Sequence, residues 1–353
     1  MTKVRCPICA DEFLWSPTPT VHLYNEETSA YDAKDISRMP PVRQAQLRVT
    51  GYQKCPHPSR DMDEHYLPAT YFDYPDPLVI GLIGASSAGK THLLTAMVRE
   101  AYRDGLGPYG IQTSALDFRR HNAFQSLYVK PLEEGTPLPG TRQGVTEAAD
   151  ILLARGANGQ QRPITFFDVA GEDLESTHAL NPATRFLAAA NAVIFVHGLE
   201  DPPEPGGPAP QDTSWSFELA IERLKGVEGA DRIPAAVAVT KSDRLRYVPP
   251  IDRWLRHRDE HGLNAARLRA ESRDVYAFLH YSKAYGSLRP FSAFRRCTLH
   301  FVSASGGDAV RTDGTPARFV RGLHPVNVLQ PLVSILAMSG MILGPEAERV
   351  GSR

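Results

Sequence analysis

The sequence predicts an α/β protein built as a three-layer sandwich, with a mostly parallel sheet between helices and a small irregular module before it. Two observations predict this class. Short apolar runs typical of buried strands alternate with segments whose apolar residues recur at helical spacing. Ligands of such sheets bind at the carboxyl ends of the strands. The predicted strands cover 78–83, 164–168, 192–196, 235–240 and 298–303, and the predicted helices cover 91–104, 181–190, 214–226, 263–283 and 328–338.

Composition excludes two classes of protein. The 353 residues contain 39 Lys and Arg against 40 Asp and Glu, which gives a net charge of −1. A protein that binds nucleic acid non-specifically needs a surplus of Lys and Arg on its surface. This balance of charges therefore argues against such binding. Hydrophobic residues make up 42% of the chain. This share can form a sizeable core and excludes wholesale disorder.

The apolar pattern divides the chain into three parts. Residues 1–70 lack clear periodicity and form the N-terminal module, 71–343 form the main domain, and 344–353 form a C-terminal tail. Within the main domain, 106–163, 199–213 and 244–295 are predicted insertions. The N-terminus carries no secretory signal pattern, and the apolar stretch 326–343 is interrupted by Pro331, Ser334 and Gly340. We therefore expect a cytoplasmic protein without a membrane span.

A phosphate-binding loop follows the first predicted strand. Its sequence is Gly84-Ala85-Ser86-Ser87-Ala88-Gly89-Lys90-Thr91, which matches G-x-x-x-x-G-K-[ST] between a strand and a helix. The glycines let backbone N–H groups wrap a phosphate at the helix N-terminus. Lys90 is predicted to reach the β- and γ-phosphates, and the Thr91 hydroxyl to bind Mg²⁺.

A second motif, Asp168-Val-Ala-Gly171, ends the predicted strand 164–168. A carboxylate at this point can support Mg²⁺, and a glycine N–H can sense the γ-phosphate. Alone this signal is weak, because Asp before a glycine turn is common. We assign Asp168 to the magnesium site and Gly171 to the phosphate.

Two later motifs predict the recognition of guanine. Thr240-Lys241-Ser-Asp243 places a carboxylate that can accept both the N1–H and N2–H₂ of guanine, which adenine does not offer, while the Lys241 stem crosses the base. Ser303-Ala304-Ser305 follows the last predicted strand, where a backbone N–H can reach guanine O6. Each motif alone is weak evidence for a nucleotide site. However, the phosphate loop, DxxG, TKxD and SA motifs follow one another in this order, each at the carboxyl end of a predicted strand.

Together the four motifs resemble those of the Ras-like P-loop GTPases over about residues 77–340. The DVAGED sequence, the His92-Leu-Leu after the loop threonine and the cysteine-bearing N-terminus are similar, more narrowly, to the bacterial double-GTPase 2 group. The resemblance implies the P-loop NTPase fold, binding of GTP and GDP with Mg²⁺, and His92 near the nucleotide. It also implies a partner GTPase or protein effectors in a bacterial multi-component or defence system.

Two residues bear on turnover. Glu172 follows the DxxG motif, where many relatives of this fold have a Gln that orients water, and an acid there can either orient water or repel the γ-phosphate. A switch threonine is expected to close over Mg²⁺; Thr141 is preferred and Thr146 is the alternative. An arginine finger is not identifiable and can come from a partner.

The N-terminal cysteines predict a structural zinc site of zinc-ribbon type. Cys6-Pro-Ile-Cys9 has zinc-knuckle spacing, and Cys55 begins an incomplete second half. We prefer His65 as the fourth ligand, with His57 as the rival and His22 as a more distant candidate. Reduced thiols without metal are the alternative. Cys297 lies at the start of a predicted strand and is expected to be a buried thiol.

These observations lead to one principal hypothesis, a Mg²⁺-dependent GTPase that works as a molecular switch, slow or activated by a partner. A GTP-binding scaffold with little hydrolysis is the first alternative, and a P-loop ATPase or kinase is the second. The arginines that follow the guanine motif (Arg244, Arg246, Arg253, Arg256, Arg258, Arg267, Arg269 and Arg273) are interspersed with acids, so a solvated insertion is preferred to a nucleic-acid patch.

Overall fold

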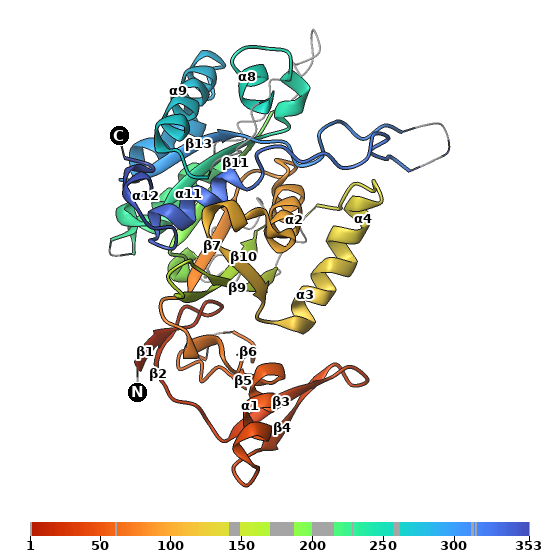
Figure 1. The fold of residues 1–353 in the computed structure, drawn as a ribbon, viewed down its shortest axis with the longest axis vertical. Coiled ribbons are helices and arrows are strands. Elements are labelled where there is room, and N and C mark those ends of the chain that lie inside the picture. The colour runs from red at the N-terminus through yellow and green to blue at the C-terminus, as the bar shows by residue number, and fades with distance from the viewer. Residues whose placement is uncertain are drawn as a thin grey trace.

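A computed structural model of the chain has two parts, a large α/β domain and a small N-terminal module beneath it in the view of Figure 1. The structure describes residues 2–60, 62–140, 149–169, 187–199, 215–227, 229–256, 262–311, 314 and 316–352. Most of the predicted helix 181–190 and of the predicted insertion 199–213 lies outside the described residues.

A seven-stranded sheet forms the centre of the large domain, in the order β13-β12-β11-β7-β10-β9-β8. The five predicted strands are confirmed, and all of them are parallel neighbours. The two remaining strands run antiparallel at one edge. The strands are β7 (Leu78–Ile83), β8 (Gln112–Ala115), β9 (Asp150–Arg155), β10 (Gln161–Asp168), β11 (Ala192–Gly198), β12 (Ala235–Thr240) and β13 (Cys297–Phe301).

Strand β7 shows why this sheet has helices on both faces. All six of its residues are buried. Because side chains alternate across a strand, Leu78, Ile80 and Leu82 enter one core, whereas Val79 and Ile83 enter the other. The first core contains α2 (Lys90–Glu100) and α11 (Gln330–Met338), and the second contains α7 (Trp215–Lys225) and α10 (Arg289–Ala293).

The remaining helices of the large domain flank the sheet. Predicted helix 263–283 is confirmed as α9 (Ala265–Tyr281), which follows α8 (Ile251–Arg256) and packs along β13. Residues after 344 form α12 (Pro345–Arg349), and Val350 is buried beside it. The Arg296 guanidinium donates to the carbonyls of Ala347 and Val350, so this terminal segment is docked onto the domain. Among the described residues, no helix is both long enough and apolar enough to cross a bilayer.

The stretch 106–163 supplies the antiparallel edge of the sheet. Between β8 and β9, three consecutive helical segments run without a break from Phe118 to Glu133: α3 (Phe118–Phe124), the π-helical η4 (Gln125–Val129) and α4 (Lys130–Glu133). We call this segment the edge helix. Its N-terminus is capped by Asp117, whose carboxylate accepts from the Arg120 N–H at 2.9 Å. Buried His121 lies 2.8 Å from Asp150 at the start of β9, which ties the edge helix to the sheet.

The prediction of an irregular N-terminal module is wrong. The module contains a two-stranded sheet, a four-stranded sheet and one helix: β1 (Thr2–Arg5), β2 (Glu12–Trp15), β3 (Thr20–Asn25), β4 (Ala30–Asp35), α1 (Pro41–Thr50), β5 (Tyr52–Lys54) and β6 (Tyr66–Pro68). Its strands are short, and its aliphatic core is small, with Val21, Ile36 and Ala69 buried. Tyrosine rings contact one another on the four-stranded sheet, with Tyr31 stacked on Tyr66 and packed against Tyr24 and Tyr52. An aliphatic periodicity therefore does not reveal them.

Hydrogen bonds between side chains join the module to the large domain. The Tyr52 hydroxyl donates to Asp117 at 2.6 Å, and the Arg119 guanidinium lies 4.3 Å from the centre of the Tyr24 ring. Tyr71, in the 3₁₀ turn η1 (Tyr71–Asp73), is fully buried, and its hydroxyl lies 2.8 Å from the Thr165 hydroxyl on β10. The module is thus joined to the edge helix, and the turn that directly follows the module is joined to the central sheet.

We expect Tyr71→Phe and Thr165→Val each to lower the free energy of unfolding by about 1–3 kcal/mol, because each leaves one buried hydroxyl without its partner. The double variant removes both hydroxyls, so its loss should be smaller than the sum of the two single losses. Urea denaturation of the four proteins measures this coupling. Strictly additive losses would contradict a direct bond between the two hydroxyls.

Candidate functional site

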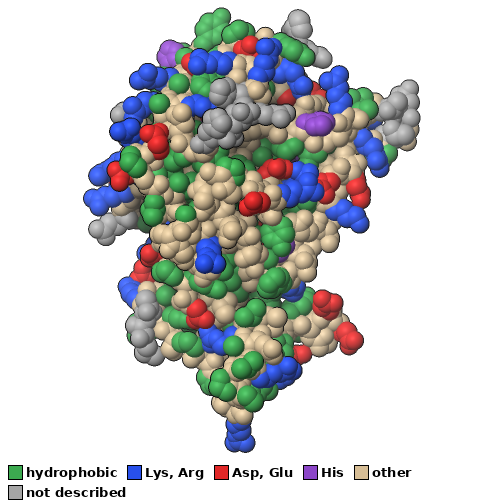
Figure 2. Space-filling view, viewed as in Figure 1, with side chains coloured by type: hydrophobic (Ala, Val, Ile, Leu, Met, Phe, Trp, Pro, Cys, Tyr) green, Lys and Arg blue, Asp and Glu red, His purple; other side chains and the backbone are tan. Residues whose placement is uncertain are grey.

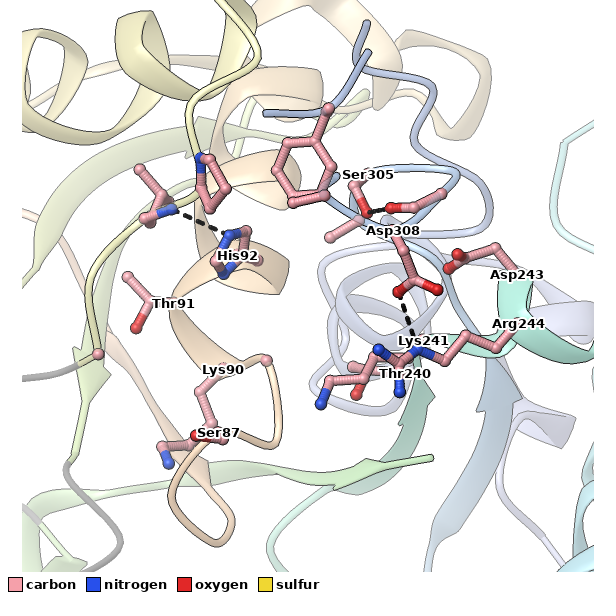
Figure 3. Close-up of a pocket in the computed structure, with 18 of the residues that line it drawn as sticks. Ser87, Lys90, Thr91, His92, Thr240, Lys241, Asp243, Arg244, Ser305 and Asp308 are labelled. Atoms are coloured by element: carbon pink, nitrogen blue, oxygen red, sulfur yellow. Dashed lines mark hydrogen bonds and ion pairs between the residues drawn. The ribbon is translucent and has the colours of Figure 1, made fainter. Parts of the chain in front are cut away.

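The predicted phosphate loop joins the end of β7 to the start of α2 at the carboxyl edge of the sheet (Figure 3). Ser87 and Gly89 have positive φ angles of 60° and 86°, which fold the loop back on itself. Lys90 is buried, and its ammonium donates to the carbonyls of Gly84 and Ala85 at 2.9 and 2.8 Å. The loop thus holds a positive charge at the N-terminus of α2, a combination that suits an anionic ligand.

Glycine is required at two positions where the loop packs against β11, the neighbour of β7 in the sheet. A Cβ atom at Gly84 would lie 2.4 Å from the carbonyl oxygen of Val196 on β11. A Cβ atom at Gly198, where β11 ends, would lie 2.9 Å from the Cα of Ala88. The Thr240 hydroxyl at the end of β12 also donates to the Ala88 carbonyl, at 2.5 Å. The loop is therefore held by close backbone packing on β11 and by a side-chain hydrogen bond from β12.

Thr91 and Asp168 meet beside the loop. The Thr91 hydroxyl donates to the Asp168 carboxylate at 2.7 Å, which brings together the first turn of α2 and the end of β10. Both groups offer the hard oxygen atoms that Mg²⁺ prefers. Gly171 and Glu172, together with Thr141 and Thr146, lie outside the described residues, and their predicted roles remain predictions.

The guanine motifs converge on the same edge. Lys241 has a positive φ of 56° and begins the 3₁₀ turn η6 (Ser242–Leu245), which turns the chain so that Asp243 lies in the pocket wall. Asp243 is only 8% exposed, and the Ser303 hydroxyl donates to its carboxylate. Ser303 also accepts from the Gly306 N–H at 2.9 Å. The two motifs, 60 residues apart, are thus joined directly by hydrogen bonds.

A single cavity of about 380 Å³ contains both groups of residues. Figure 3 shows Lys90 and Thr91 on one side and Lys241 and Asp243 on the other. The predicted residues that line it are Ser86, Ser87, Gly89, Lys90, Thr91, His92, Thr240, Lys241, Asp243, Ala304 and Ser305. Its size falls within the usual range of small-ligand pockets.

The remaining wall was not predicted from the sequence. It consists of Arg244, residues 137–140, which follow the edge helix, and residues 307–309 with Phe319, which belong to a long segment after Ser305 that projects from the domain in Figure 1. The Phe319 N–H donates to the Gly135 carbonyl at 2.8 Å, and its ring lies edge-on to His92, with centroids 6.0 Å apart. Neither segment has a motif or an apolar period, so no local signal identifies them.

Two of the arginines after the guanine motif contact acidic residues that line this cavity. Arg244 pairs with Asp308 at 2.9 Å, and Arg246 donates from Nε to the Asp243 carbonyl at 3.0 Å. Arg253 lies 4.9 Å from the centre of the Trp254 ring. Each of these three arginines therefore has a contact within the chain, and the preferred interpretation of the cluster as a solvated insertion stays a prediction.

The preferred cysteine and histidine ligands also converge. Cys6, Cys9, Cys55 and His65 place their ligand atoms within 4.8 Å of one another. The sulfur atoms of Cys9 and Cys55 are 3.8 Å apart, close to the edge of about 3.8 Å expected for a tetrahedron with zinc–sulfur bonds of about 2.3 Å. These donors therefore fit a structural zinc ion.

The rival ligand has other partners. His57 Nδ1 lies 3.1 Å from the Asp11 carboxylate, and His57 Nε2 accepts from the Met62 N–H at 3.0 Å. His57 also forms a second group with Cys9 and Asp11 whose ligand atoms lie within the same 4.8 Å. Cys297 is buried at the start of β13, as expected.

Comparison with known proteins gives one family and several distant relatives. The family model described as Double-GTPase 2 matches residues 78–280. A candidate ESX-1 scaffolding and assembly protein, SaeC of Mycolicibacterium smegmatis, is 24% identical over 219 residues, which cover 54% of this chain and 56% of that protein. The chain thus spans about half the length of this curated relative.

Two solved structures are similar at low level. The bacterial selenocysteine-specific elongation factor EF-Sec has 14% identity and a TM-score of 0.31, covering 76% of this chain and 30% of its own. The GTP-bound Ski7 GTPase-like domain of S. cerevisiae has 12% identity and a TM-score of 0.29, covering 77% and 52%.

We expect His92 to stay neutral at pH 6, because burial and then the charge of Lys241 lower its pKa to about 4. Its Nε2 can then accept the Leu138 N–H, 3.1 Å away. Since the unfolded chain takes up this proton at about pH 6.5, His92 should make stability fall as the pH drops from about 6.5 towards 4. Histidine NMR, with His92→Gln for assignment, measures the titration. A midpoint near 6.5 would contradict this environment.

Proposed function

We propose that this chain, which belongs to the Double-GTPase 2 family, binds guanine nucleotides with Mg²⁺ in the cavity at the carboxyl edge of its sheet and hydrolyses GTP as a molecular switch. One observation carries the proposal. A glycine loop around Lys90 and a buried carboxylate at Asp243 open into the same cavity, at opposite sides. This arrangement suits a ligand with phosphates at one end and a hydrogen-bond donor pair at the other.

The phosphate end rests on Lys90 and the loop backbone. The Lys90 ammonium donates to the carbonyls of Gly84 and Ala85, which places its positive charge within the loop. A phosphate that enters would meet this charge together with the N–H groups at the start of α2. A nucleotide whose phosphates are chelated by Mg²⁺ can be bound in this way, although the net charge of the chain is −1.

The base end rests on Asp243. Ser303 occupies one oxygen of this carboxylate and thereby fixes its orientation. A fixed, buried carboxylate should select a base with adjacent N–H donors, because leaving it unpaired would cost affinity. The Lys241 stem and the Phe319 ring, both in the cavity lining, supply apolar surface for the base.

Magnesium would be held by the Thr91 hydroxyl and, through water, by Asp168. When bound, the ion would neutralise charge on the β- and γ-phosphates. The water-orienting role of Glu172 and the switch role of Thr141 belong to the same proposal and rest on the sequence motifs alone.

A second function is favoured by the resemblance to SaeC, which is named for scaffolding and assembly. In this alternative, GTP would hold a complex together and would be hydrolysed slowly or not at all. Release of phosphate under single-turnover conditions separates the two. We expect release from GTP, accelerated by a cognate partner; if none occurs with or without partners, the scaffold function is supported instead.

We expect GTP and GDP to bind more tightly than ATP, and Asp243→Asn to weaken GTP binding by about 10- to 100-fold, as expected for losing hydrogen bonds to a charged group. The same variant should gain affinity for xanthine nucleotides, whose C2 carbonyl suits an amide donor. Calorimetry measures all four ligands, with Asp231→Asn, remote in an ion pair with Arg295, as the control. Equal or tighter binding of ATP would contradict guanine recognition.

We further propose that Cys6, Cys9, Cys55 and His65 bind one structural zinc ion, as a metal staple of the N-terminal module. Elemental analysis should find about one equivalent in protein purified without chelators. Cys9→Ser should lose most of the metal and destabilise the module, whereas Cys297→Ser should retain the metal. Less than about half an equivalent in the wild-type protein would contradict the site.

A further inference from the structure

A second cavity, of about 340 Å³, lies beside α9 at the start of β13. It is remote from the nucleotide cavity, because β13 begins here at Cys297, whereas its other end leads to the guanine motif at Ser303. The docked segment after α12 forms one of its sides through Gly351 and Ser352. We call this cavity the α9–β13 pocket.

The floor and walls of the α9–β13 pocket are apolar in character. Cys297 and Thr298 are buried there, and the Thr298 hydroxyl lies 2.9 Å from His300 Nε2. Two aromatic rings, Tyr276 and Phe291, stand edge to face beside the floor with centroids 5.5 Å apart. A ligand that enters would therefore bury an apolar body against sulfur, methyl and aromatic groups.

The rim of the pocket is positively charged. Arg269, Arg273 and Arg349 line it, and none of the described lining residues is an Asp or Glu. This is an unusual distribution in a chain with 39 basic and 40 acidic residues. Figure 2 shows Lys and Arg side chains gathered on the flank of the large domain where α9 and α12 lie in Figure 1.

The positive charges of these guanidinium groups are only partly neutralised by acidic partners. Arg349 reaches Glu346 at 3.4 Å with its side chain 66% exposed, and Arg269 donates to the Ser352 hydroxyl at 3.2 Å. Within the described part of the chain, no ion pair is recorded for exposed Arg273. Three cations around one apolar hollow repel each other, and an anion seated among them would relieve that repulsion.

We propose that the α9–β13 pocket binds a small organic acid, with an aromatic body on Tyr276 and Phe291 and a carboxylate at the arginine rim. Charge complementarity and the aromatic walls identify this chemistry, and the volume lies within the range of small-molecule sites. The proposal is independent of nucleotide binding, since it shares no residue with that cavity.

The test uses the full chain and two matched probes, 2-naphthoate and its uncharged amide, 2-naphthamide. We expect saturable binding of naphthoate by calorimetry and at least tenfold weaker binding of naphthamide. The double substitution Arg269→Gln and Arg273→Gln should weaken naphthoate binding at least tenfold and leave naphthamide unchanged. Arg295→Gln, an exposed arginine paired with Asp231 outside the pocket, is the matched control and should bind as the parent does.

Cys297 reports where the probe binds. Saturating naphthoate should slow modification of Cys297 by methyl methanethiosulfonate several-fold, as followed by peptide mass spectrometry, because the thiol lines the pocket. Equal affinities for naphthoate and naphthamide, or an unchanged affinity in the double arginine variant, would overturn the proposal. Binding without protection of Cys297 would also overturn it, because it would locate the probe elsewhere.

Discussion

The close approach of the phosphate loop to β11 is the constraint on which the rest of the site depends. The absence of a Cβ at Gly84 lets the loop backbone lie against Val196, and Gly198 allows the same approach from the strand side. Thr240 then fixes the loop from β12. Since β7, β11 and β12 are parallel neighbours, this packing puts the loop, the Thr91–Asp168 pair and the guanine motif at one edge.

The N-terminal module is connected to this edge through the edge helix. Asp117, at the start of the edge helix, accepts from Tyr52 of the module, and residues after the end of this helix line the cavity proposed to bind the nucleotide. The Gly135 carbonyl, just after the edge helix, also accepts from the Phe319 N–H. The edge helix and the residues that follow it therefore contact both the module and the segment that carries Phe319. The module and the cavity wall are therefore parts of one continuous packed structure.

Positive side chains are concentrated at particular sites of the protein, although the chain as a whole has no surplus of positive charge. Near the nucleotide cavity, Arg244 and Arg246 are used within the protein, on Asp308 and on the Asp243 carbonyl. At the opposite end of β13, the arginines of α9 and α12 surround a cavity whose described lining residues include no Asp or Glu. A net charge of −1 is thus compatible with two cationic sites of different kinds, one buried around Lys90 and one exposed.

The sequence by itself determined the five parallel strands, four of the helices beside them (α2, α7, α9 and α11) and the four motifs, because contiguous residues carry the burial pattern of a strand or helix and the chemistry of a loop. Only the tertiary structure decided which distant residues meet. Ser303 on Asp243, Phe319 on His92 and His65 beside Cys6 are contacts between segments far apart in the chain. The four-stranded sheet of the module escaped detection because its strands are short, its aliphatic core is small and its tyrosine rings contact one another between segments that are apart in the sequence.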